Sequence, residues 1–144
     1  MLKKEHILVK EQVRCWEDSI RMAASTLLKE NIITKLYIEK MIENVYNLGP
    51  YIIVSPEVAI PHARHCDGVN APAISILKLQ KKVMFDEASN KSAKLIIVLA
   101  STSGDTHMQL LKYVSNILSN SCRYTRLLES EDIDTIYNIF KEEV

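Results

Sequence analysis

Reactive side chains gather in one short stretch of the 144-residue sequence, between Ala59 and Val69. The stretch holds two histidines, a cysteine, an arginine and an aspartate: His62, His65, Cys66, Arg64 and Asp67. Pro61 fixes its own φ angle and biases the residue before it toward extended backbone, so we expect His62 where a strand ends. A neutral imidazole is a competent nucleophile near pH 7, because its ordinary pKa is about 6.5. We therefore predict that His62 is a nucleophile that faces solvent or a cleft.

A second histidine, His107, follows a nearly unbroken apolar run at 94–100 and a segment rich in helix-capping residues at 101–106. Ligands of open α/β sheets bind at the carboxyl ends of strands, and the first turn of a helix offers free backbone N–H groups. A phosphoryl group would be well placed there. Phosphoryl transfer asks mainly for positioning and charge stabilisation, which His107 and Arg64 can provide.

Other chemistries find less support in the sequence. Neither a Walker-type loop nor a glycine-rich nucleotide loop is present, which argues against direct use of ATP. A zinc site can be imagined from His62, His65, Cys66 and His107, but their spacing matches no common ligand pattern. We therefore expect no metal and no other cofactor. A metal-dependent hydrolase built on this cluster is the alternative, to be rejected if the purified protein retains no metal.

Composition limits the partners and the compartment. Lys+Arg and Asp+Glu both number 18, and the basic residues are scattered, so we expect no nucleic-acid partner. The three cysteines are widely spaced and the first residues lack the apolar segment of a secretory signal, which favours a cytoplasmic protein. No apolar run approaches the roughly 20 residues of a membrane span. The length fits one domain, residues 1–144.

Apolar periodicity predicts the elements that position these residues. Helices are expected from Val13 to about residue 30 and from Thr34, as cap, to Leu48, where Gly49-Pro50 ends the second. Short extended segments at 51–54 and 58–60 lead into His62. Strands are expected at 73–79 and 94–100, with a brief extended segment at 83–85, and three helices then follow as far as residue 140. This order predicts an α/β fold in which a mixed β-sheet is sandwiched between α-helices.

An ordered set of segments resembles a known family. The set comprises Leu-Gly-Pro-Tyr-Ile-Ile-Val at 48–54, Ala-Ile-Pro-His-Ala-Arg at 59–64, Asp-Gly-Val at 67–69 and Asp-Thr-His-Met-Gln-Leu-Leu at 105–111. It resembles the type-2 enzyme IIA of the bacterial phosphoenolpyruvate-dependent sugar phosphotransferase system, the mannitol/fructose class. The Pro-His-Ala-Arg form and the Leu-Gly-Pro-Tyr-Ile run are most similar to the ascorbate branch.

The resemblance implies roles for three residues. His62 would be the phosphohistidine nucleophile, modified on Nε2, which requires a local hydrogen bond at Nδ1. His107 would be the auxiliary histidine that stabilises the phosphoryl group. Other branches have a glycine after the active histidine, where Ala63 stands here, and an arginine before the Pro-His pair. Since this sequence lacks that arginine, Arg64 is a candidate to replace it as a phosphoryl clamp.

The resemblance also implies partners. The chain would take the phosphoryl group from the histidine phosphocarrier protein and pass it to a cysteine of enzyme IIB. Sugar uptake, with ascorbate as a candidate, would then occur through the membrane enzyme IIC. The alternative is a regulatory enzyme IIA-like module, of the nitrogen-regulatory type or part of a transcription-regulator system. The sequence leaves a homodimer open.

Overall fold

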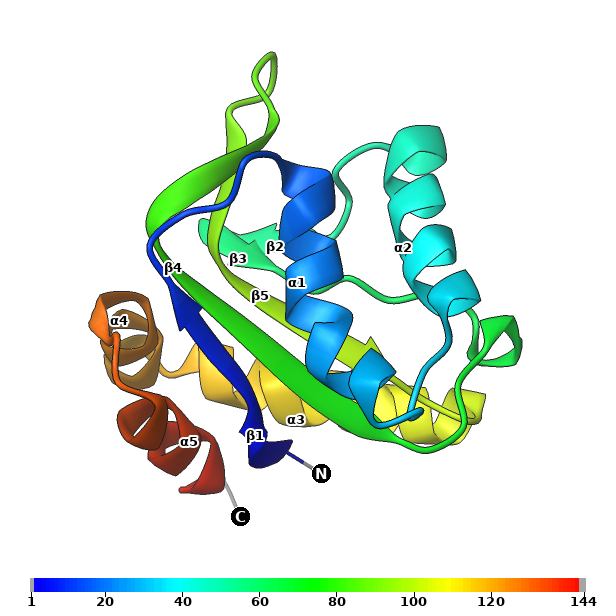
Figure 1. Ribbon diagram of the computed structural model, residues 1–144. Helices are drawn as coiled ribbons and strands as arrows, with labels where there is room; N and C mark the ends of the chain where they lie inside the picture. The colour runs from blue at the N-terminus through cyan, green and yellow to red at the C-terminus, as the bar shows by residue number, and fades with distance from the viewer. Residues whose placement is uncertain (1, 143–144) are drawn as a thin grey trace.

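The computed structural model describes residues 2–142, and its elements surround one β-sheet (Figure 1). In chain order the elements are β1 (Leu2–Lys10), α1 (Trp16–Lys29), α2 (Lys35–Leu48), β2 (Ile53–Ser55), β3 (Glu57–Ala59), the 3₁₀ turn η1 (His65–Asp67), β4 (Ala73–Asp86), β5 (Lys91–Ala100), α3 (Gly104–Ser119), α4 (Ser121–Glu129) and α5 (Ile133–Lys141). No helix within residues 2–142 is long and apolar enough to cross a membrane.

The sheet is mixed, with the strand order β1-β4-β5-β3-β2. β4 pairs parallel with β1 and antiparallel with β5, while β3 pairs parallel with β5 and antiparallel with β2. Since β3 and β5 are parallel neighbours, their carboxyl ends lie at the same edge of the sheet. The chain leaves β3 toward His62 and leaves β5 toward His107, so this pairing brings the two predicted histidine segments together.

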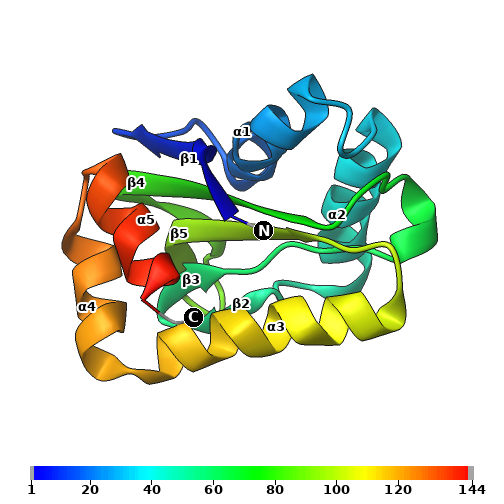
Figure 2. The same cartoon turned by 90° about the horizontal axis from the view of Figure 1, so that it is seen from below.

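Helices cover both faces of the sheet, which confirms the predicted α/β sandwich. α1 and α2 pack on one face, and α3, α4 and α5 pack on the other (Figure 2). The apolar run of β5 serves both faces, because Ile96 and Val98 belong to the α1/α2 core while Ile97 and Leu99 belong to the α3–α5 core. A strand buried on both faces needs this unbroken apolar sequence.

The structure differs from the predicted elements in three places. The chain begins with a strand, β1, where no element was predicted, and this strand lies at the edge of the sheet. The segments at 73–79 and 83–85 are parts of one long strand, β4, that continues through an exposed stretch at 80–82. The segment expected at 51–54 begins with a turn, and strand β2 starts only at Ile53.

Thr34 precedes α2 as predicted, but its side chain makes no capping hydrogen bond. Its hydroxyl and its backbone N–H both donate to the carbonyl oxygen of Gly68, at 3.3 and 3.0 Å. Gly68 has a φ of 110°, which favours glycine. The loop after His62 is therefore fastened to the start of α2.

Candidate active site

The backbone around His62 is held between two strands of the sheet. The N–H of Ile60 donates to the carbonyl of Ile52 at 2.8 Å, and the carbonyl of Pro61 accepts from the N–H of Leu99 at 3.2 Å. These bonds continue the β2–β3 and β3–β5 pairings past the end of β3. His62 therefore follows directly on a segment that is fixed on both sides.

The imidazole of His62 is oriented by its own chain. Nδ1 lies 2.8 Å from the carbonyl oxygen of Ile60. A carbonyl oxygen only accepts hydrogen bonds, so the proton of the neutral ring resides on Nδ1 and Nε2 carries the lone pair. The local hydrogen bond expected at Nδ1 is present. The half-buried ring therefore presents Nε2 as its nucleophilic atom.

A buried tyrosine of α2 braces the same segment. The hydroxyl of Tyr37 donates to the carbonyl of Leu99 at 2.5 Å and accepts from the N–H of Ala63 at 3.2 Å. Burial raises the pKa of Tyr37 to about 12, so the hydroxyl keeps its proton at neutral pH. One side chain thus joins the residue after His62 to the end of β5.

His107 comes to the site from the first turn of α3. Ser103 caps this helix, because its side-chain oxygen accepts from the N–H of Thr106 at 3.1 Å. The rings of His62 and His107 lie with their centroids 5.1 Å apart and their planes inclined by 39°. Burial, and then the charge of His62, lowers the pKa of His107. A neutral His107 can still donate one N–H to an anion held between the two rings.

Both histidines line one open cleft with a volume of about 280 Å³. Its other walls come from α2, from the loop after His62 and from the start of α3: Asn44, Ala63, Arg64, His65, Ser101 and Gly104. Arg64 is exposed, so its guanidinium has room to move toward an anion in the cleft. The first turn of α3, with its positive dipole end, forms part of the same wall. The arrangement combines a nucleophilic nitrogen with several groups that attract negative charge.

Comparison with known proteins decides the family. The family model for the "Phosphoenolpyruvate-dependent sugar phosphotransferase system, EIIA 2" matches residues 1–143. The chain belongs to this family. It is therefore an EIIA-type phosphotransferase component, and the family and activity class predicted from the sequence are confirmed.

Individual relatives agree with this assignment. The chain is 22% identical over 141 residues to the ascorbate-specific PTS system EIIA component of Escherichia coli K12, covering 94% of this chain and 92% of that protein. It is similar to the mannitol-specific cryptic phosphotransferase enzyme IIA of Escherichia coli, with 27% identity, a TM-score of 0.90 and coverage of 98% and 95%. Enzyme IIAMTL of Escherichia coli, solved with phosphorylated IIBMTL, shares the fold at 20% identity, with a TM-score of 0.85 and 99% coverage of both chains.

Sequence reasoning missed two residues of this EIIA site. The rings of Tyr51 and His62 lie nearly perpendicular, at an interplanar angle of 84° and a centroid distance of 5.7 Å. Tyr37 was overlooked although it lies beside Ile38 and four residues before Met41, on the buried side of α2. Its polar hydroxyl on an apolar helix face was the available signal, since a buried tyrosine hydroxyl usually finds a partner.

The imagined zinc cluster does not assemble in this EIIA fold. Within residues 2–142, one group of three side chains has ligand atoms close enough together to hold a metal ion, namely Glu5, His6 and Glu30. His65 lines the cleft, whereas Cys66 lies on the exposed side of η1 and is not among the residues of the cleft wall. Cys66 therefore has no part in the site, and His65 contributes to the cleft wall alone.

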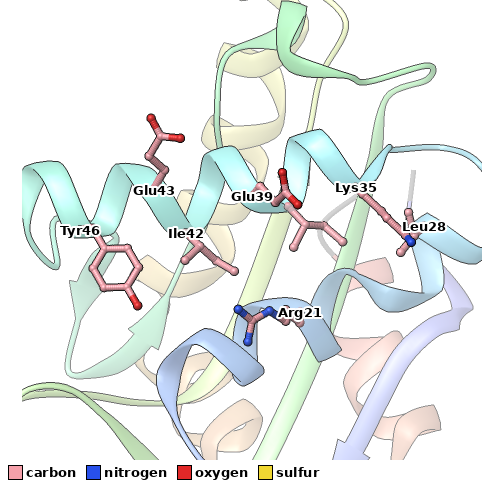
Figure 3. Close-up of a pocket in the computed structure, with 8 residues that line it drawn as sticks. Arg21, Leu28, Lys35, Glu39, Ile42, Glu43 and Tyr46 are labelled. Atoms are coloured by element: carbon pink, nitrogen blue, oxygen red, sulfur yellow. The ribbon is translucent and has the colours of Figure 1, made fainter.

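A second and larger groove, of about 420 Å³, lies away from the histidines between α1 and α2 (Figure 3). Arg21 of α1 points into it opposite Ile42 and Glu39 of α2. Its lining residues include no histidine, so neither of the two predicted site histidines, His62 and His107, faces this groove. The candidate active site of this EIIA chain is accordingly the smaller cleft.

Proposed function

We propose that residues 1–144 act as one cytoplasmic EIIA phosphocarrier domain in which His62 carries the phosphoryl group. The observation that supports this most directly is the hydrogen bond between His62 Nδ1 and the carbonyl of Ile60. It leaves Nε2 unprotonated in a cleft that His107 also lines. The donor is the histidine phosphocarrier protein, and the acceptor is a cysteine of enzyme IIB.

The transfer proceeds in two displacements. The Nε2 lone pair of His62 attacks the phosphorus of the donor phosphohistidine, and the donor imidazole leaves as the P–N bond breaks. The IIB thiolate then attacks the phosphorus on His62, and the bond to Nε2 breaks in turn. His107 donates its N–H to a phosphoryl oxygen, and Arg64 adds positive charge. Both steps pass the same group between nucleophiles, so they consume no nucleotide.

Exposed apolar side chains beside the histidines suit successive protein partners. Tyr51, which is 40% exposed, touches the His62 ring, and Met108, which is 63% exposed, follows His107 on α3. Leu48 ends α2 three residues before Tyr51 and is 69% exposed. Contiguous patches of exposed apolar side chains mark protein interaction sites. We propose that both partners dock there, and that the IIB partner belongs to an ascorbate-type system with a membrane IIC, as the name of the relative from Escherichia coli suggests.

The test is phosphorylation by purified components. Incubation with phosphoenolpyruvate, enzyme I and the histidine phosphocarrier protein should give one acid-labile phosphate on the wild-type chain. His62→Ala should acquire none, whereas Cys66→Ala, which changes an exposed residue outside the cleft wall, should be phosphorylated normally. His107→Gln should still accept phosphate but should lose it faster, by roughly tenfold or more. Labelling of His62→Ala would contradict the assignment of the nucleophile.

Transfer onward tests the partner. An ascorbate-type IIB added to the phosphorylated wild type should remove the label from His62 and acquire it on cysteine. If phosphorylated His62 forms but no sugar-system IIB accepts the group, the regulatory function is favoured over transport.

A further inference from the structure

Ser101, in the wall of the active cleft, is a buried polar residue to which the fold gives no partner. It directly follows β5 and is 1% exposed. Two other serines are equally buried, and both are satisfied: Ser19 and Ser75 each donate to a main-chain carbonyl oxygen of α1 at 2.6 Å. Within residues 2–142 the Ser101 hydroxyl makes no hydrogen bond. Because a buried hydroxyl without a partner costs folding free energy, its presence in the cleft points to a ligand.

The register of the sheet places this hydroxyl on the same face as His62. The N–H of Leu99 donates to the carbonyl of Pro61, which continues the parallel pairing of β3 with β5 and sets Leu99 beside His62. Side chains alternate between the two faces along a strand. Ile60 and Leu99 both belong to the α3–α5 core. His62 and Ser101, each two residues further along, are therefore diagonal neighbours on the face that α3 covers.

The first turn of α3 completes this arrangement. α3 begins three residues after Ser101 and carries His107 to the same cleft, which the side chain of His62 also lines. A phosphoryl group on Nε2 of His62 would enter this cleft. It would meet the Ser101 hydroxyl at the end of β5 and the His107 ring on α3, while the exposed Arg64 approaches from the loop.

We propose that the Ser101 hydroxyl donates a hydrogen bond to an oxygen of the phosphoryl group on His62. This inference rests on the proposed role of His62 as the phosphoryl carrier. A hydrogen bond to a charged oxygen is stronger than one between neutral groups. A donor that is already fixed in the cleft also needs no reorganisation when the negative charge arrives, so it stabilises the transfer. Ser101 keeps its proton and forms no bond to phosphorus.

The burial of Ser101 gives this role a distinct signature. Tyr51 and Met108 are exposed beside the histidines and can touch a protein partner, whereas Ser101 is covered. Loss of its hydroxyl should therefore slow phosphoryl transfer without weakening partner binding. It should also leave the unphosphorylated chain at least as stable as before, because alanine removes a buried polar group that has no partner to lose.

The experiment measures phosphoryl transfer from the purified, phosphorylated histidine phosphocarrier protein to Ser101→Ala. The variant should be labelled on His62 to the same extent as the wild type. Its maximal rate should fall about tenfold or more, with an unchanged KM for the carrier, and its phosphohistidine should hydrolyse faster. Thr102→Ala is the matched control, because it removes a neighbouring hydroxyl that is exposed and outside the cleft wall, and it should transfer as the wild type does.

Urea denaturation of the unphosphorylated proteins separates phosphoryl binding from a role in the fold. Ser101→Ala should unfold at the urea concentration of the wild type or above it. Wild-type rates of transfer and hydrolysis in Ser101→Ala would overturn the proposal and leave His62 as the carrier. A parallel loss of rate and stability would also overturn it, as would an acid-stable phosphate that Ser101→Ala lacks. Absence of label from the wild type would overturn the proposed function itself, and this inference with it.

Discussion

A single hydroxyl group, that of Tyr37, connects the segment that follows His62 with the end of β5, the strand that leads to His107. Replacement of Tyr37 by phenylalanine leaves the N–H of Ala63 and the carbonyl of Leu99 without this partner in a buried setting. We expect the free energy of unfolding to fall by about 1–3 kcal/mol, because unsatisfied buried polar groups are costly. We also expect slower phosphorylation of His62, because Ala63 is less firmly held. Urea denaturation and the rate of label uptake measure the two effects.

Tyr46→Phe provides a matched control on the same helix. The Tyr46 hydroxyl donates to Glu17 at an exposed position, and the residue is 65% exposed. Loss of the Tyr46 hydroxyl should change the free energy of unfolding by less than about 0.5 kcal/mol. If the two variants unfold at the same urea concentration, Tyr37 does not brace the site.

His107 makes the stability of the protein depend on pH. Its pKa is lowered in the folded state, chiefly by burial and further by His62. The unfolded chain, with a histidine pKa of about 6.5, therefore binds this proton at higher pH than the folded chain does. The contribution of His107 to stability is complete above about pH 6.5 and is lost as the pH falls from there toward the lowered pKa.

The corresponding experiment compares His107→Gln with the wild type. Between pH 7.5 and pH 5.5 the wild type should lose more stability than the variant, as urea midpoints will show. His65→Gln should keep the pH dependence of the wild type, because it leaves His107 and the ring beside it in place. An equal loss for wild type and His107→Gln would contradict the assigned cause.

At the scale of elements, Gly68 fastens the loop after His62 to the start of α2. A Cβ atom added there would lie 2.0 Å from Thr34 Oγ1, and the backbone φ of 110° is itself unfavourable for alanine. We expect Gly68→Ala to lower the free energy of unfolding by about 2–4 kcal/mol. Chemical denaturation measures the loss.

Gly104→Ala separates this local conflict from the general effect of replacing glycine. A Cβ at Gly104 meets nothing within 4 Å, so the variant should stay within about 1 kcal/mol of the wild type. Equal stability of the two variants would show that the contact between Gly68 and Thr34 is unimportant.

Much of this arrangement could be predicted because local patterns determine it. The apolar run of β5 and the capping residues before α3 located His107, and Pro61 located His62 at a strand end. β1 escaped prediction because its residues at 3–6 are polar and irregularly paired, and its hydrogen bonds come from β4, more than 60 residues later. The bracing by Tyr37 was equally inaccessible, since its partners lie 26 and 62 residues away. Contacts between distant segments leave little trace in a local pattern.

At the scale of the molecule, the two helical layers share one sheet. β4 and β5 contribute alternate residues to the α1/α2 core and to the α3–α5 core, so neither layer has a sheet of its own. Loss of packing in one layer should therefore weaken the other. A chain of this size is expected to unfold in one cooperative transition.

Ile117→Ala tests this coupling from one side of the sheet to the other. Ile117 of α3 is fully buried in the α3–α5 core, and truncation should cost about 2–5 kcal/mol. The single tryptophan, Trp16, lies in the other layer, where its ring stacks on that of Phe85 with the ring centroids 5.6 Å apart. Because both layers depend on β4 and β5, tryptophan fluorescence and circular dichroism should shift to the same lower urea midpoint. Leu27→Ala, in the α1/α2 core, should likewise lower the urea midpoints of fluorescence and circular dichroism to one common value. The coupling is contradicted if Ile117→Ala shifts the circular dichroism transition and leaves the fluorescence transition in place. The two layers would then unfold separately, and a partner docked at the histidines would stabilise only part of the chain.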